Sequence, residues 1–577
     1  MQKMDPQPWK FLDNYRGKFF NSEWPSLPEL FNISTERYPN NKVFEAFSPK
    51  HISFTYTEAK AIMLKVANWL YSKGVRKGDR VAVTGKNSPE WAIAYLGIQY
   101  MGGIVVPVDT ALTGAEIEHL VDYVDIKGIF LDADKFASIG LNDKYGFRVS
   151  LEEKGQEDNY ILNLPDVGPQ PIEMACSSDL AAFLFTSGTT GTPKAVMLSH
   201  ENFTYDCFAA QAYMNILPTD VFYVILPIHH AYTMLAVFIE TISQGCSCVF
   251  GKRLVVHQIL KEMKQGNVTM LLAVPLLYNK IFSALMQGVK EKGPIVNAFV
   301  HMMMGICGFL KQKFGINLGA KVFKKMLLSK VSLDNNRICI SGGGPLPAET
   351  FKGFNQIGVT FVQGYGLTET SPIVTLNPAW SYEYASIGKA LPGIELKLIN
   401  VDEAGSGEIL CRGKMVMKGY YNNPEATAEV LDEEGWLHTG DIGYIDAKGF
   451  VYLTGRAKNI IVTEGGKNVF PEEIEDHFQL YYDIEQICVL GYTADEKQKI
   501  EGIACLIQPS AECQKAYPDK DAMLKHMNEI VDIVNRELLS YKRIRKVFVV
   551  DEPLELTSTK KLKRFIIAKK YKEMINA

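Results

Sequence analysis

The chain has 577 residues, a net charge of -4 and 47% apolar residues. This length exceeds what one hydrophobic core usually supports, so we expect a large, subdivided domain and at least one smaller domain. Acidic and basic residues are interspersed, so the sequence shows no cluster of basic residues of the kind that binds nucleic acid. The ten cysteines show no CxxC spacing, no secretory signal is visible at the start, and no apolar run reaches membrane-spanning length, so we expect a cytoplasmic protein with reduced thiols.

Amphipathic and apolar segments alternate through the first part of the chain. Thr57–Lys73 and Ala115–Val124 have helical periodicity, whereas Arg80–Val83 and Gly128–Leu131 are short apolar runs. Such alternation is typical of βαβ units with helices on both faces of a sheet. We therefore predict an α/β fold whose large N-terminal domain contains doubly wound sheets.

Four polar, glycine-rich stretches each follow a short run that favours a β-strand. The runs are Leu180–Phe185, Phe222–Leu226, Ile338–Ile340 and Val359–Val362. Ligands of open α/β sheets bind outside the carboxyl ends of the strands. We therefore expect the four loops to converge on one crevice.

The first of these loops, Thr186–Lys194, has the composition of a phosphate-binding loop. Its glycines let backbone N–H groups approach an anion, its hydroxyls add hydrogen bonds, and Lys194 adds a positive charge. It is not a Walker loop, because Pro193 precedes the lysine and Ala195 follows it. The alternative is an ordinary Ser/Thr/Gly surface loop. We predict an ATP-using enzyme.

The pattern of apolar and polar residues changes twice in the second half of the chain. After about Gly388 short alternating runs such as Gly407–Arg412 predict a small antiparallel β-barrel. From about Asn459, a predicted helix at Pro471–Tyr481 and a strand at Gly502–Gln508 begin a compact α+β tail, which continues with a helix at 521–539 and a strand at 546–550. We predict an N-terminal domain at 1–455, a hinge at 456–459 and a C-terminal domain at 460–577.

Motifs along nearly the whole chain occur in the order found in the adenylate-forming (AMP-binding) superfamily of acyl-CoA synthetases, luciferases and adenylation domains. They are Thr186–Lys194, His229-His230, Ser341–Pro345, Tyr365–Glu369, Gly407–Gly413, Trp436–Asp441, Gly455–Lys458 and Thr557–Arg564. The chain most resembles a medium- or long-chain fatty acyl-CoA synthetase. This resemblance implies a ligase that forms an acyl-adenylate from ATP, releases pyrophosphate, and then transfers the acyl group to CoA.

The resemblance also implies which residues bind the nucleotide. The expected ATP- and AMP-binding residues are Thr186, Ser187, Gly188, Thr189, Thr190, Gly191, Lys194, Gly343, Gly344, Pro345, Gln363, Gly364, Tyr365, Gly366, Thr368, Asp441, Arg456 and Lys561. Tyr365 offers a flat face to adenine, and Asp441 accepts hydrogen bonds from the ribose hydroxyls near Arg456. In isolation, residues 438–441 are more often an ordinary turn.

Glu369 and Thr186 are the expected ligands of Mg²⁺, since this ion bridges phosphates with few protein oxygens. A glutamate before a helix also serves as an N-terminal cap. The acid substrate is already ionised at neutral pH, so adenylation requires no general base. It requires cations and N–H groups that hold two anions together and stabilise charge at phosphorus.

Lys561 is the residue expected to carry adenylation, because its ammonium group can lie at the α-phosphate. Many relatives have glycine before this lysine, whereas this chain has Lys560, and a solvated basic tail is the alternative. His230 is expected to steer the carboxylate, although a His-His pair after a strand can be purely structural. Lys458 is the expected hinge residue.

Gly465 and Gly466 are expected to line the CoA pantetheine tunnel after the C-terminal domain rotates, and they also suit a hairpin turn. Tyr232–Phe238 and Ile338–Ile340 are expected to line the acyl pocket. The Met-rich segment Phe299–Leu310 precedes a Lys-rich stretch, which fits either peripheral membrane contact or a packed helix pair.

Three functions remain open from the sequence. The first is a fatty acid:CoA ligase that uses ATP, Mg²⁺ and CoA. The second keeps adenylation but uses an aromatic, succinylbenzoate-like acid, or transfers the acyl group to a carrier-protein phosphopantetheine. The third is a non-catalytic acyl or nucleotide sensor, which the presence of Lys561, Glu369 and Asp441 disfavours. The sequence carries no signal for the acyl chain length or the oligomeric state.

Overall fold

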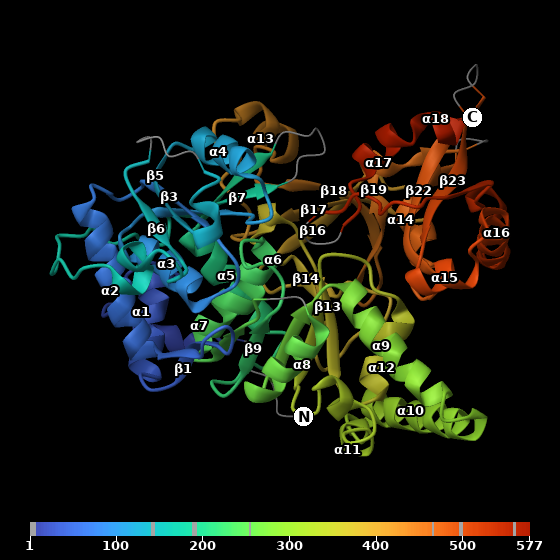
Figure 1. Cartoon of the computed structure of the whole chain (residues 1–577), viewed down its shortest axis with the longest axis horizontal. Coiled ribbons are helices and arrows are strands. Elements are labelled where there is room, and N and C mark those ends of the chain that lie inside the picture. Colours follow the sequence, from blue (N-terminus) through green and yellow to red (C-terminus); the bar gives the residue numbers. More distant parts are fainter. Residues whose placement is uncertain are drawn as a thin grey trace.

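The computed structural model describes residues 7–139, 145–186, 193–252, 255–463, 467–495, 500–557 and 561–576. Two mostly parallel sheets form the N-terminal part, and smaller antiparallel and mixed sheets follow toward the C-terminus (Figure 1). The predicted α/β fold class is therefore confirmed.

The larger sheet has nine strands in the order β15-β14-β13-β12-β11-β9-β10-β1-β2. The strands from β1 through β10, β9, β11 and β12 to β13 run parallel, and the edges are antiparallel. The bounds are β1 Lys42–Ala46, β2 Ile52–Thr55, β9 Val221–Val224, β10 Ser247–Phe250, β11 Met270–Ala273, β12 Ile338–Ser341, β13 Thr360–Tyr365, β14 Thr375–Leu376 and β15 Lys389–Ala390.

The second sheet has six strands in the order β6-β5-β3-β4-β7-β8 and is parallel except for the pair β7/β8. The bounds are β3 Arg80–Thr84, β4 Ile104–Val108, β5 Ile126–Leu131, β6 Arg148–Ser150, β7 Leu180–Thr186 and β8 Lys194–Ser199. The four loops predicted to share one crevice thus start from two sheets, because β7 lies in this one and β9, β12 and β13 lie in the other.

Helix α3 (Pro89–Tyr100) joins the two sheets. Ser88 caps it by accepting a hydrogen bond from the Trp91 N–H, and all of its residues are buried. It packs against β1 of the larger sheet and against β3 and β4 of the smaller one. Most of its residues are apolar, with Glu90 and Gln99 as buried exceptions, and such a helix is typical of an interior position.

The other N-terminal helices surround this core. They are α1 Leu27–Arg37, α2 Tyr56–Ser72, α4 Gly114–Tyr123, α5 His200–Gln211, α6 Ala231–Thr233, α7 Glu240–Gln244, α8 Val256–Gln265, α9 Pro275–Lys290, α10 Pro294–Phe314, α11 Gly319–Val322 and α12 Ala348–Gln356. A π-helical segment, Met234–Ile239, links α6 to α7. The helices predicted at 57–73 and 115–124 are confirmed within one residue as α2 and α4.

A four-stranded antiparallel sheet, β16-β17-β18-β19, follows the parallel sheets. Its bounds are β16 Glu395–Ile399, β17 Gly407–Arg412, β18 Leu437–Ile445 and β19 Val451–Arg456, with α13 at Pro424–Val430. The chain then passes through the 3-10 turn η8 (Ala457–Asn459) and the short strands β20 (Ile461–Val462) and β21 (Asn468–Val469).

The C-terminal part contains a three-stranded sheet, β22-β23-β24, flanked by helices. The bounds are α14 Pro471–Asp476, β22 Ile484–Asp495, β23 Ile500–Pro509, α15 Ala511–Ala516, α16 Lys520–Glu537, β24 Lys546–Val549, α17 Arg564–Lys570 and α18 Lys572–Asn576. The helix predicted at 471–481 ends at Asp476, because the chain then tightens into i→i−3 hydrogen-bonded turns such as Phe478 N–H to the Glu475 carbonyl.

Candidate active site

Glu369 and Lys194 lie on either side of Tyr420. Glu369 is in the 3-10 turn η7 (Thr368–Thr370), just beyond β13, and its Oε1 accepts a hydrogen bond from the Tyr420 hydroxyl at 2.8 Å. The Lys194 ammonium lies 4.7 Å from the centre of the Tyr420 ring. Thr186, at the end of β7, pairs with Lys194 in the β7/β8 register. The end of β13 and the start of β8 therefore meet, although they belong to different sheets.

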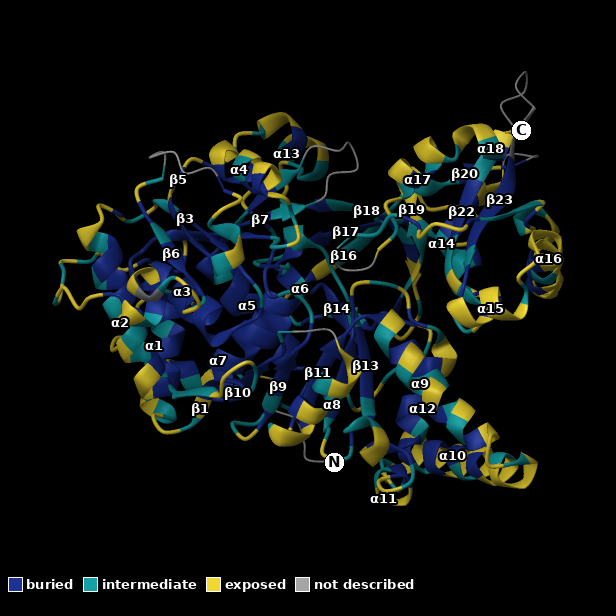
Figure 2. Ribbon diagram, viewed as in Figure 1, coloured by how far each residue is buried: buried dark blue, intermediate teal, exposed yellow. Residues whose placement is uncertain are grey.

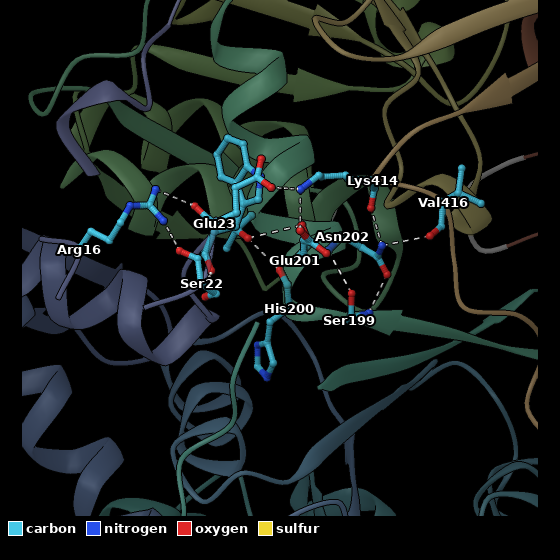
Figure 3. Close-up of polar contacts among 11 residues, drawn as sticks. Arg16, Ser22, Glu23, Ser199, His200, Glu201, Asn202, Lys414 and Val416 are labelled. Carbon is cyan, nitrogen blue, oxygen red and sulfur yellow. Dashed lines mark hydrogen bonds and ion pairs between the residues drawn. The ribbon is translucent and has the colours of Figure 1, made fainter. Parts of the chain in front are cut away.

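A polar network holds the segment that carries Tyr420 (Figure 3). Lys414 forms ion pairs with Glu23 and with Glu201, the latter at 3.0 Å. Asn202 donates to the carbonyls of Lys414 and of Val416, the latter at 3.0 Å. The next residue in the chain, 417, donates its N–H to the Glu369 carbonyl at 2.9 Å. The start of α5 therefore positions both partners of the Tyr420–Glu369 bond.

Asp441 lies on β18 with both carboxylate oxygens engaged. Oδ2 accepts a hydrogen bond from the Tyr365 hydroxyl at 2.5 Å, and Oδ1 is 2.9 Å from Nε of Arg456 on β19. Burial and the neighbouring carboxylate raise the pKa of Tyr365, which keeps its hydroxyl a donor. The bond to Asp441 fixes the plane of the ring, as an adenine-stacking face requires.

The loop after β12 depends on a left-handed glycine. Gly343 has φ +83°, and a Cβ placed there meets nothing closer than Val274 Cγ1 at 3.9 Å. The space beside the loop is therefore open, as a bound base requires. By contrast, Gly342 packs closely on the ring of Tyr232, which a Cβ would reach at 2.9 Å.

His230 follows β9 and precedes α6. Its ring centre is 4.2 Å from that of His229, and His229 Nε2 is 3.5 Å from Oδ2 of Asp109. Burial lowers the pKa of His230 to about 3, the Lys561 charge acts in the same direction, and Asp109 opposes it. His230 is therefore neutral throughout the physiological pH range.

Lys561 reaches this site from the C-terminal part of the chain. Its backbone N–H donates to the Thr557 hydroxyl at 3.0 Å, and its carbonyl accepts from the Thr557 N–H at 2.8 Å. The residue is exposed overall, although the protein around its side chain desolvates the ammonium group. This desolvation and the Arg456 charge lower the pKa of Lys561, whereas Asp441 raises it. Lys561 is therefore within electrostatic range of the Asp441–Arg456 pair and of His230.

A buried ion pair anchors the Lys561 loop. The two guanidinium nitrogens of Arg564 lie 2.8 Å from the two carboxylate oxygens of Glu475, and Arg564 also donates to the Val489 carbonyl at 2.6 Å. The pair joins α17 to α14 and β22. Such a bidentate pair gives the loop a fixed orientation.

The described residues thus bring together most of the predicted site. Gln363 is buried on β13, Gly364 and Gly366 flank Tyr365, and a Cβ at Gly366 would lie 1.5 Å from the Pro372 carbonyl oxygen. Pro345 accepts a hydrogen bond from Gln479 Nε2 at 3.4 Å. Lys458 is exposed in η8.

Ser187, Gly188, Thr189, Thr190, Gly191, Gly465 and Gly466 lie outside the described residues.

Tyr420 and Asp109 were not predicted from the sequence. Asp109 directly follows the apolar strand β4, so the rule applied to the other strand ends also indicates it. No local sequence pattern indicates Tyr420, because its hydrogen-bond partner Glu369 is 51 residues away in the chain.

The chain is similar to known proteins along most of its length. The chain is 28% identical to a long-chain-fatty-acid–[acyl-carrier-protein] ligase of Arabidopsis thaliana, over 96% of this chain and 87% of that protein. It is also 28% identical to the long-chain-fatty-acid–CoA ligase ACSBG2 of Mus musculus, over 96% of this chain and 92% of that protein. Among solved structures, ATP-bound MatB from Rhodopseudomonas palustris matches with a TM-score of 0.74 and 25% identity, covering 96% of this chain and all of that one.

Two family models match the sequence. The model for the AMP-binding enzyme family covers residues 31–421, and the model for the AMP-binding enzyme C-terminal domain covers residues 458–577. The first of these spans more than half of the chain. The chain therefore belongs to the AMP-binding enzyme family.

Proposed function

We propose that this protein is an ATP-dependent ligase that joins a fatty acid to the thiol of CoA through an acyl-adenylate. The observation that carries the proposal is the position of Lys561. A lysine from the C-terminal part lies within electrostatic range of the Asp441–Arg456 pair and of His230. In this proposal the α-phosphate of ATP reacts between the ribose site at Asp441 and the carboxylate site at His230, within reach of Lys561.

The first half-reaction joins two anions. The acid attacks the α-phosphorus as its carboxylate, and pyrophosphate leaves. Lys561 stabilises the charge that develops at the α-phosphate, and Lys194 binds the departing phosphates with the hydroxyl of Thr186. Asp441 accepts hydrogen bonds from the ribose, and the Gly343-Gly344 loop approaches the adenine. Residues 187–191 complete the phosphate loop in this proposal.

The site around Glu369 fits Mg²⁺. Among the described residues, Glu369 forms no ion pair with a lysine or arginine, and Tyr420 holds one of its oxygens. A partly buried carboxylate oriented in this way suits an ion that takes few protein ligands. When bound to ATP, Mg²⁺ neutralises phosphate charge.

His230 is suited to receive the acid. Because its ring is neutral, it orients a carboxylate by a hydrogen bond rather than by forming an ion pair. Beyond it, Tyr232 packs on Gly342 and donates to the Ile340 carbonyl at 3.2 Å. The buried π-helical segment Met234–Ile239 continues this apolar wall. We propose that the acyl chain lies along it.

The second half-reaction transfers the acyl group to a thiol. In this proposal the residues after 459 rotate about Lys458, withdraw Lys561 and bring Gly465 and Gly466 to line the pantetheine tunnel. Two names among the relatives support different acceptors, CoA for one and an acyl-carrier protein for the other. We favour CoA, and the carrier protein is the second candidate.

Pyrophosphate release tests the function. The enzyme is given MgATP with fatty acids of increasing length, or with o-succinylbenzoate, in the presence and absence of CoA. We expect turnover that has a chain-length optimum and requires CoA. An adenylate that only an acyl-carrier protein discharges would favour the second acceptor. Preference for o-succinylbenzoate would contradict the fatty-acid assignment, and no release with any acid would contradict an enzyme of this class.

A further inference from the structure

Helix α10 has an apolar face that the rest of the protein does not cover. It projects from the molecule beside α9 and α12, with buried and exposed residues along it (Figure 2). Its inner face is formed by Val300, Met304, Cys307, Gly308 and Lys311. The close approach of Gly308 to α12, where a Cβ would lie 2.7 Å from Gln356 Cγ, fixes which face points inward.

The outer face carries large apolar side chains at helical spacing. Ile295 is 84% exposed, and Phe299 and Phe309 are each 56% exposed. Met302 and Ile306 lie between them on the same face and are also exposed, as are Phe314 and Ile316 just beyond. A helix on the surface of a soluble protein normally presents polar residues outward. A continuous exposed apolar stripe of this kind marks an interaction surface.

The stripe is bordered by positive charge. Between residues 290 and 330 the chain has eight lysines and one acidic residue, Glu291, whereas the whole chain has a net charge of -4. Lys311 is buried and donates to Asn355 and to the Val359 carbonyl. The other seven lysines are exposed, and none of them forms an ion pair within the described part of the chain. Lys313 lies over the rings of Phe309 and Phe314, at 5.4 and 5.7 Å from their centres.

We propose that α10 and the Lys-rich segment that follows it form a docking surface for an anionic lipid bilayer. The apolar stripe enters the boundary between headgroups and acyl chains, and the lysines contact anionic headgroups. By length and composition α10 is the one helix among the described residues that could cross a membrane. Its inner face is packed on α12, however, so it lies along the surface instead.

Charge favours a bilayer over a second copy of the chain. An isologous dimer through α10 would place the lysines of both copies at the same interface, where they repel. An anionic surface neutralises them. The docking surface is also linked to the site, because α12 follows the Gly343-Gly344 loop and packs on α10. If the proposed function holds, docking places the enzyme at the surface into which long-chain acids partition, but the docking itself does not depend on that function.

Vesicle sedimentation tests the proposal without substrates. The full-length protein is mixed with vesicles of phosphatidylcholine alone or of phosphatidylcholine with phosphatidylglycerol. We expect it to sediment with the anionic vesicles and to be released at high salt, since about 1 M salt shortens the Debye length to about 3 Å. The double variant Phe299→Glu/Phe309→Glu should need about tenfold more lipid for half-binding, because charged side chains replace two exposed rings that would enter the bilayer.

Two further variants make the test specific. Lys324→Glu/Lys325→Glu should weaken binding to anionic vesicles and leave binding to phosphatidylcholine unchanged. Leu539→Glu changes an equally exposed apolar residue, 59% exposed on the C-terminal part, and should bind like the wild type. Failure of the wild type to bind anionic vesicles would overturn the proposal. A dimer in solution that the Phe299→Glu/Phe309→Glu variant dissociates, without vesicle binding, would also overturn it and assign the stripe to a second copy.

Discussion

Replacing Tyr420 with phenylalanine removes one hydroxyl from the proposed metal and phosphate site. The ring that lies beneath Lys194 stays, and only the 2.8 Å hydrogen bond to Glu369 is lost. Burial and the Glu369 charge raise the pKa of the Tyr420 hydroxyl, so it is a donor at every working pH. Any effect of Tyr420→Phe therefore reports the loss of this bond.

The size of the effect follows from the charge on the acceptor. A hydrogen bond to a charged group contributes about 1.5–3 kcal/mol. Since about 1.4 kcal/mol corresponds to a factor of ten, kcat/KM for MgATP should fall about 10- to 100-fold. The measurement is the initial rate of pyrophosphate release at varied MgATP with a fixed acid.

The neighbouring residue provides a matched control. The Tyr421 ring packs on Phe183, with ring centres 5.0 Å apart, and on Tyr123, with ring centres 6.0 Å apart. Tyr421→Phe should leave kcat/KM for MgATP within about twofold of wild type, as for a change that removes no bond at the site. Equal losses in Tyr420→Phe and Tyr421→Phe, or no loss in Tyr420→Phe, would refute the proposed role of the Tyr420–Glu369 bond.

Three further predictions concern stability. Arg564→Met leaves Glu475 without its cationic partner and should lower the free energy of opening of the C-terminal sheet by about 3–5 kcal/mol. Hydrogen exchange in β22 should then be faster than in the wild type. Unchanged exchange would contradict the anchoring role of the ion pair. Burial lowers the pKa of His200 to about 3, so the unfolded chain binds a proton that the folded chain does not between about pH 6.5 and 3, and stability falls on acidification through this range. His200→Asn should flatten this fall by about 1.4 kcal/mol per pH unit in urea unfolding, and an identical slope would disprove the linkage. Gly343→Ala, at φ +83°, should cost about 1–2 kcal/mol more than Gly344→Ala, and equal costs would show that the left-handed backbone is not required.

The sequence predicted the elements of the fold better than their assembly. Alternating apolar and amphipathic runs located α2, α4, β3 and β5, because local periodicity determines which face of an element is buried. No local pattern shows that β7 joins a different sheet from β9, since sheet membership depends on long-range pairing.

In the candidate site, too, the sequence predicted residues within motifs but missed contacts that depend on long-range pairing. Residues within motifs, such as Asp441 and Lys561, were predicted by resemblance, and their charges interact in the structure. Tyr420 was missed because its contact with Glu369 arises only when residues 418–421 pair with β8. Asp109 was missed although it follows a buried strand, the same signal that identified the loop after β9.

The most direct test separates the two half-reactions in the Lys561→Ala variant. One assay measures pyrophosphate release from MgATP and a fatty acid, and the other measures acyl-CoA formed from CoA and a supplied acyl-adenylate. In the proposed mechanism the ammonium group acts at the α-phosphate, so the first rate should fall about 100-fold or more, and the second should change by less than about threefold. Equal loss in both assays, or an unchanged rate of pyrophosphate release, would contradict the assignment of Lys561 to adenylation.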